Sequence, residues 1–307
     1  METFYLFLGL FLAVLAIFDL SVGVSNDAVN FLNASIGSKA ASFRVIMIVA
    51  AVGILVGAAL SNGMMDIARH GIYQPQYFYF SEIMCILVAV MLTDVVILDI
   101  FNSLGMPTST TVSLVFELLG GTVAYSLIKI ANDTEGILQI GNLMNTDKAL
   151  TVILGIFTSV AIAFIFGALV QYISRLIFTF NYRKTAKYFI GLFGGLAATS
   201  IVYFMLFKGL KSSPFLAGPV ADYIFSHTAD LVLYCFIGFT ILMQVLHWLK
   251  VNVFKVIVLM GTFALALAFA GNDLVNFIGV PLAGYSAYTD FLAQNGTTTP
   301  DTFLMTS

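Results

Sequence analysis

Long apolar runs separated by short polar breaks recur along most of the 307-residue chain. A helix needs about 20 predominantly apolar residues to cross the hydrocarbon core of a bilayer, and the runs have about this length. One soluble core does not account for so many of them, so the pattern predicts membrane-spanning helices. We expect these helices over residues 3–23, 43–61, 149–178, 188–208, 229–249 and 253–270.

Two more apolar segments, residues 81–102 and 108–130, are of helix length and are joined by a polar stretch. They form either two full spans or one re-entrant hairpin, and both arrangements return the chain to the side from which it came. Residues 62–76 mix apolar and charged side chains, which is typical of either a short interfacial piece or a loop. Together the segments predict an all-α integral membrane protein with about eight transmembrane helices, some of them broken or re-entrant.

Composition and charge support this class of protein. Hydrophobic residues make up 60% of the chain and charged residues 9%, against roughly 45–50% and about 25% in soluble domains. The net charge of -3 gives no reason to expect a nucleic-acid partner, so the expected surroundings are membrane lipids. Basic residues concentrate in the loops after the first, fifth and seventh spans, which predicts that these loops are cytoplasmic and that the N-terminus lies outside a cell membrane. They are Lys39, Arg44, Arg175, Arg183, Lys184, Lys187, Lys250 and Lys255.

A short polar motif occurs twice. Residues 25–31 and 271–277 share the pattern N-D-x-V-N-F, with five identities in six positions, and each copy lies near the end of an apolar span. The chain makes an odd number of crossings between the copies, so they should point in opposite directions through the membrane. The pattern therefore predicts an inverted-repeat transporter architecture.

Each copy also follows glycine or small polar residues that favour breaking a helix. A broken helix frees backbone carbonyls, which are tolerated inside a membrane only where they line a site. Together with carboxylate and amide oxygens they suit a hard cation such as sodium, with Asp27 and Asp273 supplying the charge. The alternative is that these side chains merely cap helix ends. The candidate cation ligands are Asn26, Asp27, Asn30, Asn272, Asp273 and Asn276.

A hydroxyl cluster follows Pro107 and opens the helix predicted to run to about residue 130. A helix N-terminus offers free amides and partial positive charge, which favours phosphate, and hydroxyls add hydrogen bonds. None of the three motifs contains Lys or Arg, so a cation bound near Asp27 or Asp273 would have to offset carboxylate repulsion of the anion. The alternative is a capped helix without a ligand. The candidate phosphate ligands are Thr108, Ser109, Thr110 and Thr111.

These motifs resemble the signatures of the inorganic phosphate transporter (PiT) family. The family pattern G-A-N-D-V-A-N-A-F-G-T-S-V-G-S is similar to residues 24–38, its P-S/T-S-T-T to residues 107–111, and its second-repeat motif to residues 270–276. The resemblance implies a sodium-coupled or proton-coupled phosphate symporter, often a homodimer, with phosphate held between re-entrant segments. The departures are Val24 and Asn33, which replace glycines, and Val112, which replaces a frequent histidine.

The repeats suggest a domain organisation. Residues 1–130 form the first transport repeat, comprising a broken helix over 3–37, a helix over 43–61 and a hairpin or span pair over 81–130. Residues 131–250 are connecting membrane helices, and residues 251–307 begin the second inverted repeat. The repeat offset of 246 places a second hydroxyl cluster near position 353, so we expect a fragment or one part of a split transporter.

The expected function is symport of inorganic phosphate coupled to a cation gradient, with sodium as the main candidate and no other cofactor. The chain has no Walker loop, G-x-S-x-G or H-E-x-x-H motif, so we expect a transporter and no enzyme. The alternatives are a carrier of sulfate or another tetrahedral oxyanion, an intramembrane enzyme with Asp27 and Asp273 as an acid pair, and a non-transporting receptor or scaffold. The acids Asp94, Asp99 and Glu117 are expected to line a cation path, to partner helix ends or to lie at the membrane interface.

Overall fold

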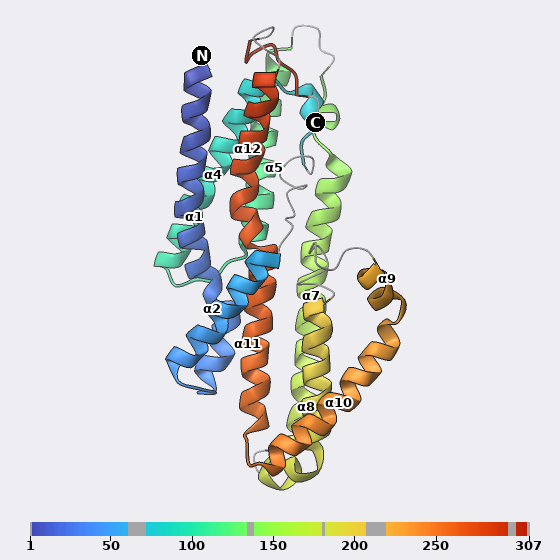
Figure 1. Cartoon of the computed structure of the whole chain (residues 1–307). Helices are drawn as coiled ribbons and strands as arrows, with labels where there is room; N and C mark the ends of the chain where they lie inside the picture. The colour runs from blue at the N-terminus through green and yellow to red at the C-terminus, as the bar shows by residue number, and fades with distance from the viewer. Residues whose placement is uncertain are drawn as a thin grey trace. The chain divides into compact units, whose positions relative to one another are not determined.

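A computed structural model describes residues 2–60, 72–133, 138–179, 182–206, 219–293 and 299–305. Apart from two isolated bridges, the secondary structure of these residues is helical (Figure 1), which confirms the all-α prediction. Seven of the described helices are long and apolar enough to cross a membrane, and α2 contains a shorter apolar stretch. The helices are α1 (Glu2–Gly37), α2 (Phe43–Leu60), α4 (Phe80–Ser103), α5 (Thr110–Ala131), α6 (Ile140–Leu143), α7 (Thr146–Phe178), α8 (Tyr182–Phe204), α9 (Pro219–Ser226), α10 (Thr228–Trp248), α11 (Val253–Asn272) and α12 (Leu274–Ala293), with a 3-10 turn at Pro75–Tyr77.

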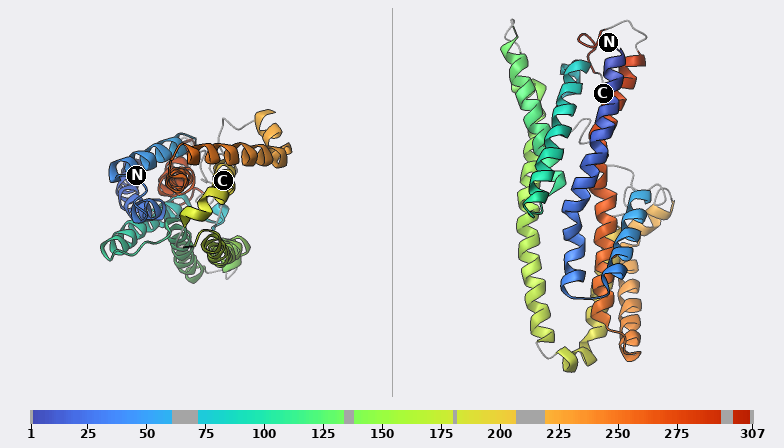
Figure 2. Two further views of the ribbon diagram at one scale, coloured as in Figure 1. Left: turned by 90° about the horizontal axis from the view of Figure 1, so that it is seen from below. Right: turned by 90° about the vertical axis from the view of Figure 1, so that its left-hand side faces the viewer.

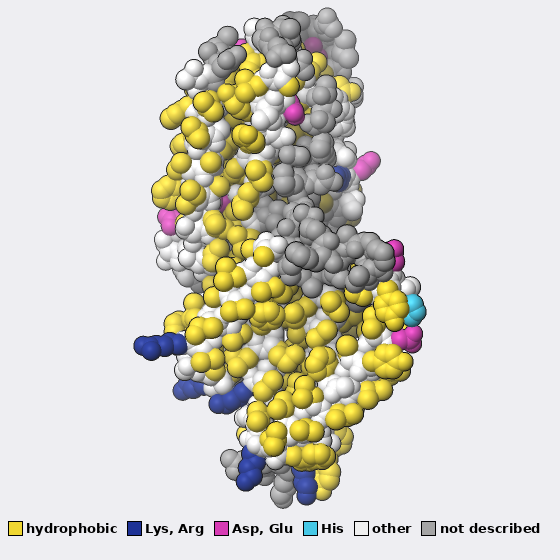
Figure 3. All heavy atoms as spheres, in the orientation of Figure 1, with side chains coloured by type: hydrophobic (Ala, Val, Ile, Leu, Met, Phe, Trp, Pro, Cys, Tyr) yellow, Lys and Arg dark blue, Asp and Glu magenta, His cyan; other side chains and the backbone are white. Residues whose placement is uncertain are grey.

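The predicted spans agree with α2, α7, α8, α10 and α11 to within a few residues, except that α8 begins six residues earlier than expected. Of the two arrangements left open for residues 81–130, the structure has two separate helices, α4 and α5, each long enough to cross a membrane. Most of the segment 62–76, for which an interfacial piece or a loop was expected, lies outside the described residues. Hydrophobic side chains cover much of the face in Figure 3, as a lipid-facing surface requires.

The chain divides into two compact units. Unit 1 comprises Met1–Val29, Gly63–Phe157 and Asp273–Ser307, and unit 2 comprises Asn30–Asn62 and Thr158–Asn272. Unit 1 thus combines the beginning and the end of the chain, and the domain organisation into repeats stays a prediction.

Unit 1 is built from α4, α5, α12 and most of α1. α4 packs antiparallel on α5, and α1 and α12 run in opposite directions along the unit (Figures 1 and 2). The inverted repeat expected from the two copies of the motif stays a prediction. Large apolar side chains fill the space between the helices, including Leu12, Phe80, Met84, Leu87, Leu118 and Val280.

Unit 2 is held by close helix packing across glycines. α2 packs on α11, and a Cβ at Gly53 would lie 2.7 Å from the Phe263 carbonyl oxygen, while one at Gly57 would overlap the backbone of Leu267. The spacing of four residues between the two glycines lets the backbones approach, which is the usual way for helices to associate in a membrane. The buried hydroxyls of Ser35 and Thr262 also hydrogen-bond to each other.

The break expected in the first span is wrong, because α1 continues without interruption from Glu2 to Gly37. The hydroxyls of Ser21 and Ser25 donate to the carbonyls of Ile17 and Ser21, one turn earlier in the same helix. Gly23 has a different role from the one the sequence suggested, since a Cβ there would overlap the ring of Phe277. This glycine permits close packing of α1 on α12 within unit 1.

The second copy of the motif does interrupt a helix. α11 ends at Asn272 and α12 begins at Leu274, with Asp273 in a turn between them. α12 itself was not among the expected spans, because Pro281 and polar residues dilute its apolar pattern. The two copies therefore place similar sequences in different backbone settings.

Gly23→Ala is expected to destabilise the protein by about 1–3 kcal/mol, because the added methyl group must displace the buried ring of Phe277. Gly9→Ala is the matched control on the same helix, where a Cβ meets nothing within 4 Å. That control should be neutral or stabilising by up to about 1 kcal/mol, since alanine favours a helix. Thermal unfolding in detergent measures both effects, and equal midpoints for the two variants would contradict this packing.

Candidate substrate and cation site

Asn26 joins α1 to the segment that precedes α5. Its side chain is 4% exposed, its Oδ1 accepts a hydrogen bond from the Thr108 backbone N–H at 2.8 Å, and its Nδ2 donates to the Met106 carbonyl oxygen at 3.1 Å. Gly105, with φ of 67°, makes the turn that brings this segment back towards α1. Asn26 therefore fixes the position of the hydroxyl cluster.

Ser109 is the N-cap of α5. Its Oγ accepts a hydrogen bond from the Val112 backbone N–H at 3.4 Å, and the helix starts at Thr110. Pro107 lies two residues before the cap, where its missing N–H costs no helical hydrogen bond. The first turn of α5 thus presents backbone amides and hydroxyls beside α1.

Two adjacent hydroxyls connect this helix start to both copies of the repeated motif. Thr110 Oγ1 donates to Asp27 Oδ2 at 3.0 Å, and Thr111 Oγ1 donates to Asp273 Oδ1, also at 3.0 Å. Asp27 is 4% exposed, and Thr110 is buried as well. Residues that are far apart in the sequence therefore meet at the N-terminus of one helix within unit 1.

The structure describes the other predicted cation ligands only in part. Asn30 lies one turn after Asp27 on α1, but its side chain is exposed and it belongs to unit 2. The side chains of Asn272 and Asn276 are outside the described part of the structure. The structure therefore brings together Asn26, Asp27, Asp273 and the hydroxyl cluster.

The sequence argument missed three contributors. The Met106 carbonyl and Asn102, whose Nδ2 donates to the Val22 carbonyl oxygen at 3.3 Å, hold the loop against α1. Asp19 was overlooked altogether, although a carboxylate inside an apolar span is itself a signal of function. It is completely buried in unit 1.

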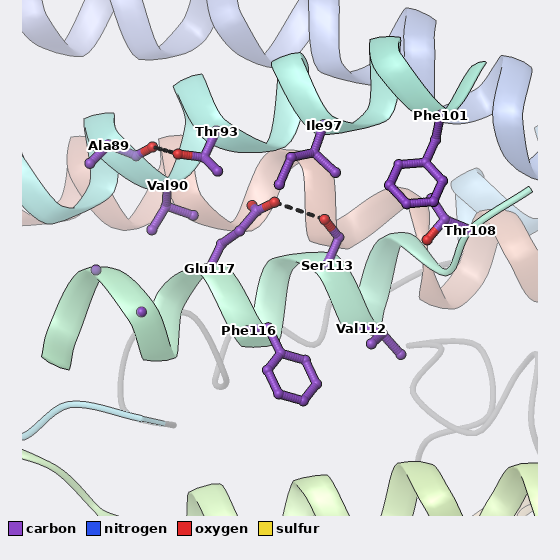
Figure 4. Close-up of a pocket in the computed structure, with 12 residues that line it drawn as sticks. Ala89, Val90, Thr93, Ile97, Phe101, Thr108, Val112, Ser113, Phe116 and Glu117 are labelled. Atoms are coloured by element: carbon purple, nitrogen blue, oxygen red, sulfur yellow. Dashed lines mark hydrogen bonds between the residues drawn. The ribbon is translucent and has the colours of Figure 1, made fainter. Parts of the chain in front are cut away.

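A pocket of about 520 Å³ lies between α4 and α5 and is lined at one end by Thr108. Figure 4 shows Glu117 and Ser113 on one side of it, facing Thr93 and Ile97 of α4. Ser113 Oγ donates to Glu117 Oε1 at 2.7 Å. Polar groups thus continue along α5 beyond the hydroxyl cluster.

The fold and this site define a multi-pass helical membrane protein whose polar centre is made of carboxylate, amide, hydroxyl and backbone groups. The chain belongs to the phosphate transporter family, which matches residues 23–306. It is a family of transporters and not of enzymes, as expected.

Among solved structures, the chain is similar to one described as the sodium-dependent phosphate transporter. The sequence identity is 19% and the TM-score 0.67, and the alignment covers 98% of this chain and 71% of the other. At this identity the similarity shows a shared fold. No curated protein matches the chain.

Proposed function

We propose that the protein carries out symport of inorganic phosphate driven by a cation gradient, with sodium as the coupling ion. The observation that carries this proposal is the pair of adjacent hydroxyls, Thr110 and Thr111, that donate to Asp27 and Asp273. One helix N-terminus thereby touches the carboxylates of both motif copies. The uncharged donors proposed for the anion and the two carboxylates proposed for cations are therefore in direct hydrogen-bond contact.

Phosphate binds at the start of α5, where backbone amides and the helix dipole favour an anion. The proposed ligands are Thr108, Ser109, Thr110 and Thr111. In the structure the hydroxyls of Thr110 and Thr111 donate to carboxylates. When a cation binds the carboxylate, the hydroxyl hydrogen is released to donate to phosphate, because the hydroxyl oxygen can coordinate the cation while its hydrogen donates. Anion and cation therefore load together.

Sodium is proposed because the available ligands are all oxygen atoms, which suit a hard cation. Asp27 and Asp273 supply the charge, and the remaining proposed ligands are Asn26, Asn30, Asn272 and Asn276. The structural relative is described as sodium-dependent, which supports the same choice of ion. Without a cation, two carboxylates would repel an arriving phosphate.

Uptake of labelled phosphate into proteoliposomes tests the proposal. An inward sodium gradient is expected to drive accumulation, a potassium gradient of equal size should not, and sulfate should compete poorly. Accumulation that follows a proton gradient and ignores sodium would overturn the choice of ion. Equal transport of sulfate would overturn the choice of substrate.

We also propose that the protein is a homodimer in a cell membrane with its N-terminus outside. Cysteines introduced at Asp133 and Asn181, in a background lacking Cys85 and Cys235, are expected to react from opposite sides. Asn181 should be labelled from the cytoplasm, because four bases between Arg175 and Lys187 flank it. Labelling of both positions by an impermeant reagent added to intact cells would contradict this orientation.

A further inference from the structure

A second polar cluster lies inside unit 1, away from the hydroxyls at the start of α5. Asp19 of α1 is 0% exposed, Asp94 of α4 is 2% exposed, and Glu117 of α5 borders the pocket between α4 and α5. Neither carboxyl oxygen of Asp19 receives a hydrogen bond from an N–H or hydroxyl group of the described residues, and Asp94 Oδ1 and Glu117 Oε2 receive none either. Buried carboxylates without donors are costly, so this cluster requires an explanation.

The three carboxyl groups lie close to one another. Asp19 is within hydrogen-bonding reach of Asp94, and Asp94 is within reach of Glu117. The hydroxyl of Ser113, from outside the cluster, donates to Glu117 and is also within hydrogen-bonding reach of Asp94.

Among the described residues, no Lys, Arg or His is an electrostatic partner of any of the three carboxyl groups. Lys129 forms its ion pair with Glu82. α12 also packs on α4 and α5. The electrostatic partners of the cluster do not include the described titratable residues of α12, which are Tyr285, Tyr288 and Asp290. Asp27 also interacts electrostatically with Asp94, and this interaction is repulsive. Among the described residues, therefore, no basic side chain offsets the charge of the cluster.

Carboxyl groups in direct contact cannot all be ionised. Like charges at this distance repel strongly in a medium of low dielectric constant, and two carboxyl groups form a hydrogen bond only when one of them carries a proton. The charge must be offset by a proton or by a cation. A proton on one of two neighbouring carboxyl groups supplies the hydrogen bond between them, which a cation does not, and this favours the proton.

We propose that Asp19, Asp94 and Glu117 form a proton-binding site, with a proton shared between Asp19 and Asp94. Two helices connect this site to the hydroxyl cluster. On α5, Thr110, Ser113 and Glu117 follow one another at the spacing that places residues on one face of a helix. On α1, Asp19 lies seven residues before Asn26, again on nearly the same face. Protonation of the cluster therefore changes the position of α5 and of its hydroxyl cluster. As a result, the rate of phosphate uptake depends on pH.

Infrared spectroscopy of the purified protein in lipid tests the site without requiring transport. The wild type is expected to show the C=O stretching band of a buried carboxylic acid at neutral pH, which fades as the pH is raised. Asp19→Asn and Glu117→Gln should each reduce this band. Asp290→Asn, at an exposed carboxyl on α12 of the same unit, should leave it unchanged.

Three results would overturn the site: no such band in the wild type, an undiminished band in both cluster variants, or loss of the band on adding sodium at constant pH. The last result would mean that a cation and not a proton occupies the cluster. Asp19→Asn mimics the protonated, neutral state, so we expect this variant to fold.

The link to transport is tested separately and rests on the proposed phosphate symport. The initial rate of uptake in saturating sodium is expected to vary with external pH in the wild type, and this variation should flatten in Asp19→Asn. An unchanged pH profile in that variant would overturn the link. Because the infrared band does not depend on phosphate, failure of the proposed function and failure of the proton site are distinguishable.

Discussion

Asp27→Asn and Asp273→Asn are each expected to abolish sodium-driven phosphate uptake while leaving the protein folded. Asparagine keeps an oxygen that accepts the hydrogen bond from Thr110 or Thr111, so the variant removes charge and retains the contact. Interactions with a charged group are worth about 1.5–3 kcal/mol, so sodium affinity should fall by about tenfold to a hundredfold. Uptake in proteoliposomes at matched protein levels measures the effect.

Asp290→Asn serves as the control for charge removal in the same unit, because this side chain is exposed on α12 and has no proposed role. It should transport at the wild-type rate. Two Asp variants that accumulate phosphate as fast as this control would show that neither carboxylate holds the coupling ion. The hydroxyl contacts would then have to be explained as helix capping alone.

A double variant, Thr110→Val with Thr111→Val, is expected to weaken phosphate binding by about a hundredfold while sodium still binds. Valine retains the shape of threonine and removes the hydroxyl that donates to the anion. Each hydrogen bond to a charged ligand is worth about 1.5 kcal/mol or more, so the loss of two gives an effect of this size. Equilibrium binding of labelled phosphate, with sodium binding measured separately, checks the expectation.

Thr122→Val on the same helix is the matched control. Thr122 is completely buried in α5 and its hydroxyl has no hydrogen-bond partner among the described residues, so valine should fit without loss. Phosphate affinity in this variant is expected to equal that of the wild type. If the control weakened binding as much as the double variant, the effect would arise from packing of α5 and not from contact with the anion.

The membrane helices could be predicted from sequence because a bilayer imposes a simple length and polarity requirement on each segment. For the same reason α12 was missed, since Pro281 and several polar residues weaken its apolar pattern while burial in unit 1 retains the helix. The alternatives for residues 81–130 differed only in tertiary arrangement, and local pattern does not distinguish them.

The class of protein, the approximate bounds of most helices, the family and the repeated motif could be read from the sequence, because they depend on local composition and on short motifs. The arrangement of the motif side chains depends on tertiary packing. Gly23 permits an uninterrupted α1 to pack against Phe277, whereas helix propensity alone favoured a break. Thr110 and Thr111 reach Asp27 and Asp273, and Asp19 meets Asp94, because packing within unit 1 brings these side chains together from distant parts of the chain.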